Sequence, residues 1–291
     1  MTTFGLILPT MRDGASREVI EAGAEAAECL GWAGVWTTDH VLVPRETSTE
    51  YGRVYEAITT LAWLGGRHPR LRLGVSVIVV PQRDAVVLAK ELATLDDLSG
   101  GRVIAGVGVG WNEAEFANLG KSERFHRRGA YLDETIALWR HLWSGATDPF
   151  DGTFHRLRDF AFAPLPAQGA RLPILVGGRS PGALRRAGAL ADGYHSSGIG
   201  PSGYAERVPA IRAAAEAAGR PMPRLSARVA ARFDGAPDGS VLGGTPEQMR
   251  DQVRAFQAAG VEEFMVGFEP RDPAAFVATL ERFDREVVGA A

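Results

Sequence analysis

The chain has 291 residues, of which 45% are hydrophobic and 23% charged, and its formal net charge is −3. This balance is ordinary for a folded protein with a large core, and it gives no basic surface for nucleic acid. The N-terminal sequence lacks a basic leader, and no run reaches the roughly 18 apolar residues of a membrane helix. The single cysteine, Cys29, makes no internal disulfide and is expected to be a small core residue. We therefore expect a cytoplasmic protein that binds neither nucleic acid nor membranes.

Strand-like runs alternate with helix-like segments along the chain. The amphipathic segment after the first run extends from Ser16 to Leu30, with Ser16 placed as its N-cap. Regular alternation of this kind calls for a parallel sheet with right-handed crossovers. Eight repeats in a chain of this length predict a closed (β/α)8 TIM barrel, with a doubly wound open sheet as the alternative. The predicted strands are residues 4–8, 34–38, 72–80, 102–108, 173–178, 192–197, 224–233 and 263–268.

The stretch from residue 151 to residue 169 breaks the alternation. Its sequence, DGTFHRLRDFAFAPLPAQG, mixes aromatic and polar residues and predicts a short hairpin inserted before the fifth strand. No linker is long or polar enough to divide the chain, so we predict one domain over residues 1–291.

Residues 103–116, VIAGVGVGWNEAEF, carry glycines at positions 106, 108 and 110. A dinucleotide-binding fingerprint needs G-x-G-x-x-G in the first strand–helix turn, but here the third glycine comes one place early and the motif follows the fourth strand. Glycines at alternate positions of a strand clear one face, so that a flat ligand can approach the backbone. The alternative is that these glycines only relieve crowding inside the barrel.

Other strand ends place polar groups at the carboxyl end of the barrel, where active sites of this fold lie. The second strand ends at Asp39 and His40, and the fifth runs into GGRSP, residues 177–181. Free backbone N–H groups at a helix start, beside Arg179, favour an anion. A plain helix start capped by Ser180 is the alternative.

Four blocks of the sequence resemble the luciferase-like monooxygenase superfamily, in particular its branch that uses the deazaflavin coenzyme F420. The resemblance implies a TIM barrel that holds F420, or FMN as the alternative, at its mouth. It also implies a small-molecule substrate and a homodimer, with substrate specificity residing in the loops at 44–55 and 232–244. The four blocks are GVWTTDHV (34–41), VPQRDAVVLAKELATLDDLSGGRVIAGVGVGWNEAEFANLG (80–120), RRGAYLDETIALWRHLW (127–143) and LPILVGGRSPGALRRAGALADGY (172–194).

The resemblance assigns catalytic roles to three residues. Asp39 and His40 would lie beside the ring, with His40 as a candidate proton donor, because histidine gains or loses a proton near neutral pH. Asn112 would contact the ring edge or the ribityl chain. Trp36 and Trp111 would be ring or substrate walls, or core residues.

The same resemblance implies a cofactor-binding set. A non-prolyl cis peptide at Ser76–Val77 or Val77–Ile78 would brace the ring. Glu113 would support Asn112. The remaining contacts would come from Asp39 and Gly108, and the phosphate would be held by Gly177, Gly178 and Arg179.

The chemistry would be carried by the cofactor. F420 would give two-electron hydride transfer, and reduced FMN would allow oxygen activation. A non-catalytic cofactor-binding protein and a barrel hydrolase are the alternatives from other classes. The histidines show no metal-ligand spacing, so no metal is expected. A glycosidase needs two facing carboxylates, and nothing in the sequence pairs Asp39, Glu113 and Glu269, which lie near predicted strand ends.

Overall fold

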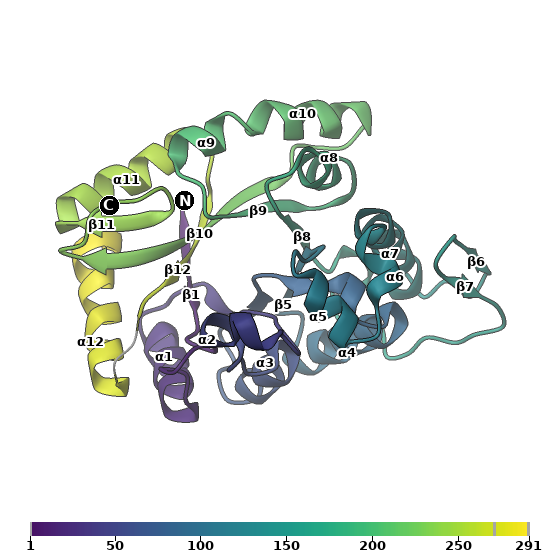
Figure 1. The fold of residues 1–291 in the computed structure, drawn as a ribbon, viewed down its shortest axis with the longest axis horizontal. Helices are drawn as coiled ribbons and strands as arrows, with labels where there is room; N and C mark the ends of the chain where they lie inside the picture. Colours follow the sequence, from purple (N-terminus) through teal and green to yellow (C-terminus); the bar gives the residue numbers. More distant parts are fainter. Residues whose placement is uncertain (1, 270–271, 290–291) are drawn as a thin grey trace.

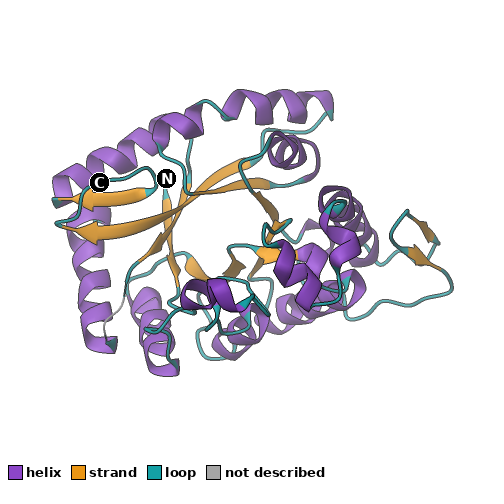
Figure 2. Cartoon of the chain, in the orientation of Figure 1, coloured by secondary structure: helices purple, strands orange, loops and turns teal. Residues whose placement is uncertain are grey.

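The structure, a computed structural model, describes residues 2–269 and 272–289. Eight parallel strands close into a barrel, seen end-on in Figures 1 and 2. The ring closes where β12 pairs with β1, with Phe264 beside Phe4. The predicted TIM barrel is confirmed and the open-sheet alternative is wrong. The strands in ring order are β1 (Thr3–Ile7), β2 (Gly34–Thr37), β3 (Arg72–Val75) continued by β4 (Ile78–Val79), β5 (Val103–Gly108), β8 (Ile174–Gly177), β9 (Gly193–Ser197), β10 (Arg224–Phe233) and β12 (Glu263–Gly267).

Helices surround the barrel. The first begins as predicted, because the Ser16 side chain accepts a hydrogen bond from the backbone N–H of Val19 at 3.2 Å. Cys29 ends this helix in an exposed position, so its expected place in the core is wrong. Within the described residues, no helix combines the length and apolar character needed to cross a membrane. The long helices are α1 (Arg17–Cys29), α3 (Ala57–Gly65), α4 (Ala85–Ser99), α7 (Arg128–Trp143), α8 (Pro181–Leu190), α10 (Val208–Ala217), α11 (Pro246–Ala258) and α12 (Pro273–Phe283).

Short helices and strands lie in the loops between these elements. At the mouth they are η1 (Arg45–Thr47), α2 (Ser48–Tyr51), η2 (Val80–Gln82), α5 (Glu113–Asn118), α6 (Ser122–Phe125) and α9 (Pro201–Ala205). Before β8, β6 (Phe150–Asp151) and β7 (Arg156–Leu157) form a short antiparallel pair that projects away from the barrel beyond α6 and α7 (Figure 1). β11 (Val241–Gly244) pairs with the end of β10, inside a stretch that was expected to be a loop.

Trp36 occupies the middle of the barrel. It belongs to a buried cluster inside the ring and stacks on His195, with ring centroids 5.7 Å apart. A side chain at Gly74 of β3 would overlap the Trp36 ring, so this glycine makes room for it. Trp36 is therefore a core residue rather than a ligand wall.

The glycines of β5 make room for the preceding strand. A Cβ at Gly106 would overlap the carbonyl oxygen of Val75, and a Cβ at Gly108 would lie 2.6 Å from Cγ2 of Val77. In both cases the two atoms would be closer than in any ordinary packing contact. The alternative that these glycines relieve crowding accounts for Gly106. Gly108 makes room for Val77, and its backbone also borders a cavity described below.

Replacing Gly106 with alanine is expected to destabilise the protein. The new Cβ would force β3 away from β5, and overpacking of this kind costs about 1–3 kcal/mol. Urea unfolding of Gly106→Ala measures the change, with Gly66→Ala as the control. Gly66 follows α3 at an exposed position where a Cβ meets nothing within 4 Å. Equal stability of the two variants would contradict the packing described here.

Candidate active site

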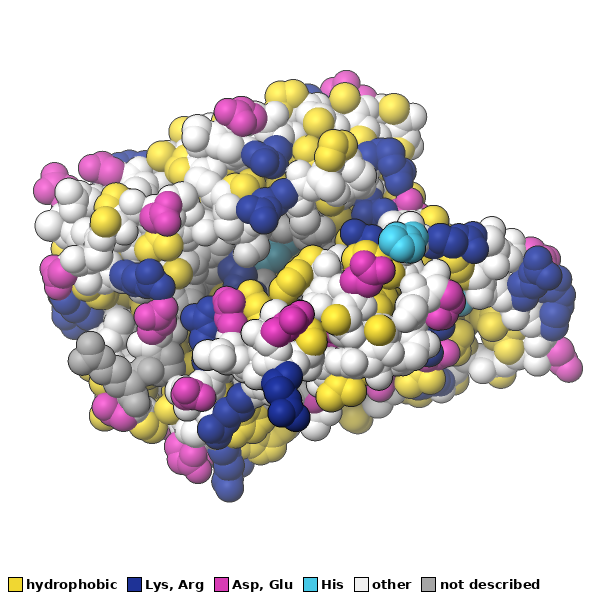
Figure 3. All heavy atoms as spheres, viewed as in Figure 1, with side chains coloured by type: hydrophobic (Ala, Val, Ile, Leu, Met, Phe, Trp, Pro, Cys, Tyr) yellow, Lys and Arg dark blue, Asp and Glu magenta, His cyan; other side chains and the backbone are white. Residues whose placement is uncertain are grey.

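Two adjoining cavities open at the carboxyl end of the barrel, in the hollowed face of Figure 3. Cavity A has a volume of about 450 Å³ and cavity B about 620 Å³, both within the range of small-molecule sites. They meet at five residues that line both, namely Met11, Arg12, Thr38, Ser197 and Arg228. Cavity A is otherwise bordered by β4, β5, β8 and β9 and by the residues that follow β2 and β3, and cavity B by β1, β10 and β12.

A cis peptide forms one wall of cavity A. The bond joins Ser76 to Val77, the first of the two predicted positions, while Val77–Ile78 is not cis. The Val77 side chain lies between two glycine positions, since a Cβ at Gly177 would come within 2.9 Å of it, as at Gly108. Ser76 and Val77 line cavity A.

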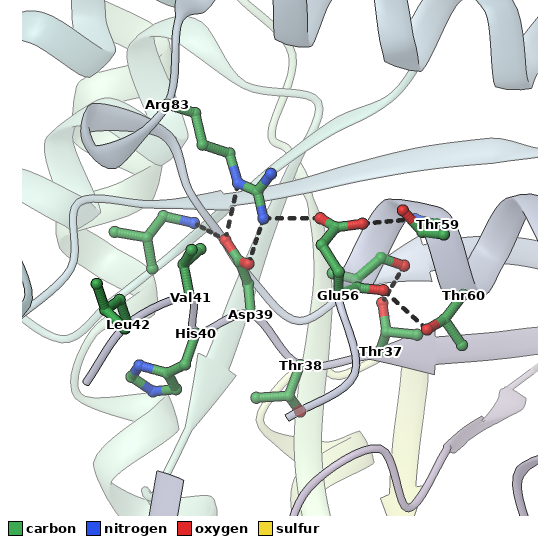
Figure 4. Close-up of polar contacts among 12 residues, drawn as sticks. Thr37, Thr38, Asp39, His40, Val41, Leu42, Glu56, Thr59, Thr60 and Arg83 are labelled. Carbon is green, nitrogen blue, oxygen red and sulfur yellow. Dashed lines mark hydrogen bonds and ion pairs between the residues drawn. The ribbon is translucent and has the colours of Figure 1, made fainter. Parts of the chain in front are cut away.

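Asp39 fixes the chain next to this wall. Its carboxylate accepts hydrogen bonds from the backbone N–H of Val79 at 2.8 Å and from Arg83 Nη2 at 2.6 Å (Figure 4). Arg83 also contacts Glu56 at 2.8 Å. Although burial disfavours the charged guanidinium, the two carboxylates raise the pKa of Arg83. The Asp39 carboxylate thus has its partners within the protein, and it acts by holding the turn that follows the Ser76–Val77 bond.

His40 is oriented by a buried carboxylate. Its Nδ1 lies 2.9 Å from Oε2 of Glu115, whose other oxygen accepts the backbone N–H of Val41 at 2.8 Å. Although burial opposes ionisation, the hydrogen bonds from His40 and Val41 hold the pKa of Glu115 below its ordinary value. An ionised carboxylate only accepts, so Nδ1 carries the imidazole proton and Nε2 is left to act on a ligand. The rings of Tyr51 and Trp111 lie beside the imidazole, at 4.6 and 6.2 Å between centroids.

The floor of cavity A holds a neutral histidine and a charged arginine. His195 lies between Ser76 Oγ at 2.8 Å and Ser226 Oγ at 2.9 Å, and burial lowers its pKa to about 3, so it is neutral at neutral pH. Arg228 donates to the Ser76 carbonyl at 2.6 Å and to Thr38 Oγ1 at 3.1 Å. Burial lowers the pKa of Arg228 to about 10, which leaves it charged at neutral pH.

The model of the luciferase-like monooxygenase family matches residues 2–233. The chain belongs to this family. The matched region contains every residue that borders cavity A, from Met11 to Arg228, so the family resemblance and the cavity concern the same part of the fold.

Individual family relatives differ in cofactor. The chain is 35% identical over 211 residues to an F420-dependent glucose-6-phosphate dehydrogenase from Mycolicibacterium fortuitum, covering 71% of this chain and 61%, about three fifths, of that relative. The fold of this chain is similar to that of an F420-dependent secondary alcohol dehydrogenase in complex with an F420-acetone adduct. The TM-score is 0.83 at 18% identity, and the match covers 99% of this chain and 98% of the other. For 3,6-diketocamphane monooxygenase from Pseudomonas putida in complex with FMN, the TM-score is 0.79 at 16% identity, over 99% and 98%. At these identities the two structures establish the fold.

The structure brings most of the predicted family residues to cavity A. Gly108 on one side and Gly177 with Gly178 on the other border the same space. Trp111 is exposed at its rim. The residues from the predicted set that line it are Asp39, His40, Ser76, Val77, Gly108, Gly177 and Gly178.

Four predicted residues do not line cavity A. Ile78 is fully buried in β4, where it pairs with Val107. Asn112 caps α5, since its Oδ1 accepts the Glu115 N–H at 3.3 Å, and its Nδ2 is buried with no hydrogen-bond partner among the described residues. Glu113 is exposed, and its role beside Asn112 stays a prediction. Arg179 is exposed beside the start of α8 and donates to the Gly198 carbonyl at 3.3 Å, and its contact with a cofactor phosphate stays a prediction.

Sequence reasoning missed Glu115 and Arg228. Glu115 lies two residues after Glu113, and only the path of α5 turns it toward His40. Arg228 left a clearer signal, because Arg224, Arg228 and Arg232 recur on one face of an otherwise apolar strand. Side chains of a strand alternate between faces, so an arginine in register with the inward Ser226 points into the barrel.

Replacing Glu115 with glutamine is expected to lower the free energy of unfolding at pH 7 by about 1.5–3 kcal/mol, because charged hydrogen bonds to buried groups are lost. The pKa of Glu115 is lower in the folded protein than its ordinary value, so its stabilisation is complete above the ordinary carboxyl range and is lost as the pH falls through the folded-state pKa. The difference between Glu115→Gln and the unchanged protein should therefore shrink in acid. Urea unfolding across pH measures it, with the exposed Glu113→Gln as control; a pH-independent difference would contradict this account.

Proposed function

We propose that the protein is an F420-dependent oxidoreductase that transfers a hydride to or from a small organic substrate, with FMN-dependent monooxygenation as the second candidate. The single observation that supports this best is cavity A, where Val77 and two glycine-bearing strand ends border a space beside His40. F420 is favoured because the relative named above, at 35% identity, is F420-dependent. The FMN alternative is supported by the fold shared with an FMN-bound monooxygenase.

The residues of cavity A fit a flavin-type ring. Its walls combine apolar side chains, Val77, Val79 and Trp111, with backbone at Gly108 and Gly110 that presents no side chain. Polar side chains, among them His40, Ser76 and Arg228, line the same cavity, as is usual where an aromatic ligand has apolar faces and a polar edge. Gly178 has φ +126°, a conformation that only glycine adopts readily, and it leads to the start of α8, which favours a phosphate.

When bound, the cofactor would supply two-electron hydride chemistry, or oxygen activation in the case of reduced FMN. The protein would supply the proton site and the orientation. His40 exchanges a proton at Nε2 with the substrate oxygen while Glu115 fixes Nδ1–H and stabilises the protonated ring. His195 does not act as an acid, because its pKa of about 3 keeps it neutral; it holds Ser76 in place.

The alternatives from other classes receive less support. A glycosidase needs two carboxylates facing one cleft. Asp39 is bound to Arg83, Glu113 is exposed outside both cavities, and Glu269 pairs with Arg232 at 2.5 Å. A non-catalytic cofactor-binding protein would not need the His40–Glu115 pair, which is built like a general acid–base site.

We also propose that the chain works as one domain and forms a homodimer. The support for the homodimer is an apolar groove of about 760 Å³ between α3 and α4, on the outside of the barrel. Leu98 is 81% exposed there, and Val87 is 56% exposed. Exposed apolar surface of this kind is typical of protein interfaces.

Titration of the cofactor-free protein with F420 and with FMN tests the proposed function. We expect saturable changes in absorbance and fluorescence with F420, and weaker changes with FMN. Stopped-flow spectra across alcohols, sugar phosphates and ketones should then give cofactor reduction with at least one class. Binding of FMN alone would refute the preference for F420, and binding without any turnover would leave the non-catalytic alternative as the better account.

His40→Asn separates chemistry from binding in the same assay. It should retain cofactor affinity and lower the rate of reduction by about 10²–10⁴-fold, the usual contribution of a general acid or base. His126→Asn is the control, because His126 lies outside both cavities.

Replacing Leu98 with glutamate should convert the dimer to a monomer in light-scattering measurements, because a charge would be buried in an apolar interface. Leu165→Glu is the control, since Leu165 is exposed outside the α3–α4 groove. A monomeric unchanged protein would contradict the proposed assembly.

A further inference from the structure

Arg228 stands out among the cations of the two cavities because its charge is not matched. Arg12 pairs with Glu50 at 2.9 Å and Arg232 with Glu269 at 2.5 Å. Within the described part of the chain, Arg228 contacts only neutral acceptors, the carbonyl and hydroxyl oxygens of Ser76 and the hydroxyl of Thr38. A guanidinium withdrawn from water without a carboxylate is unfavourable, so such a group is usually completed by an anionic ligand.

The position of Arg228 fits this role. It lines both cavities, so a group bound to it lies at their junction. Three N–H groups are accounted for by the contacts with Ser76 and Thr38 at most, and guanidinium carries five. The planar fork that remains suits the two oxygens of a carboxylate or phosphate. Burial lowers the pKa of Arg228 to about 10, which supports a desolvated charge.

Cavity B supplies the space for the rest of such a ligand. It extends from Arg228 along β10, past Val229 and Ala231, to Phe268 beyond β12. Its lining combines apolar residues, such as Leu8 and Phe268, with the charged Asp13 and the Arg232–Glu269 pair. The cavity therefore offers an anion site at Arg228 and a chamber with both polar and apolar walls beside it.

We infer that cavity B is the substrate compartment and takes an anionic substrate, a small phosphorylated or carboxylated molecule whose charged group pairs with Arg228. This rests on the proposed function, in which cavity A holds the cofactor. The pairing places the neighbouring carbon atoms of the substrate at the junction, next to the ring site and on the side of His40. Arg228 is then the residue that selects charged substrates over neutral ones.

Inorganic phosphate is the probe for this inference. Calorimetric titration of the cofactor-free protein should show binding that Arg228→Gln weakens at least about tenfold and Arg228→Lys weakens less, since lysine keeps the charge but not the fork. Arg224→Gln is the matched control. It makes the same charge change on the same face of β10, but at the opposite end of the strand, where Arg224 pairs with Glu262. Equal loss in Arg224→Gln, or unchanged binding in Arg228→Gln, would overturn the inference.

A second measurement uses the unchanged protein, because Arg228 also holds the Ser76 carbonyl and its variants could perturb the fold. Phosphate should slow the modification of Arg228 by phenylglyoxal several-fold, as measured by peptide mass spectrometry, and should leave Arg224 unaffected. In Arg179→Gln, which removes the proposed contact to the cofactor phosphate, the protection of Arg228 should persist. If the unchanged protein failed to bind F420 while phosphate still protected Arg228, only the cofactor assignment would be refuted, whereas no protection of Arg228 would refute the anionic-substrate inference.

Discussion

The close approach of β3 to β5 is the constraint on which the rest of the site depends. The carbonyl of Val75 occupies the space where residue 106 would carry a side chain, and Val77 fills the space beside Gly108 and Gly177. Only because β5 and β8 lack side chains at these points can the Ser76–Val77 segment bulge inward and form a wall. The same packing leaves cavity A bordered by backbone at Gly108 on one side and at Gly177 and Gly178 on the other.

Around this wall, environment assigns a different charge state to each polar group. Glu115 is held ionised by hydrogen bonds, His195 is held neutral by burial, and Arg228 stays charged beside the neutral oxygens of Ser76 and Thr38. Pairs of titratable groups pushed apart in this way are typical of sites that move protons. One histidine therefore orients a serine while the other, His40, remains free to exchange a proton. Because Arg228 contacts neutral oxygens of Ser76 and Thr38, its charge supports the inference that the site binds an anionic substrate.

Much of the fold could be predicted from the sequence, because strands buried on both faces leave continuous apolar runs and the repeat of strand and helix leaves few topologies. The family resemblance pointed to Asp39, to His40 and to a cis peptide at Ser76–Val77 or Val77–Ile78, of which the structure has the first. The direction in which individual side chains point was harder to predict from the sequence. Asn112, a predicted cofactor contact, caps α5, and Glu113 is exposed, whereas Glu115, two residues further on, turns inward to His40. Those outcomes depend on the path of a six-residue helix, which no local pattern determines.

A crystal structure of the protein with F420 tests the central claim most directly. The account predicts the ring in cavity A, with one face against Val77, one edge near His40, and cavity B left open beside Arg228. Density for the ring in cavity B, in the α3–α4 groove or on the outer surface would contradict it. So would a ring in cavity A whose binding had displaced the Ser76–Val77 segment from β5.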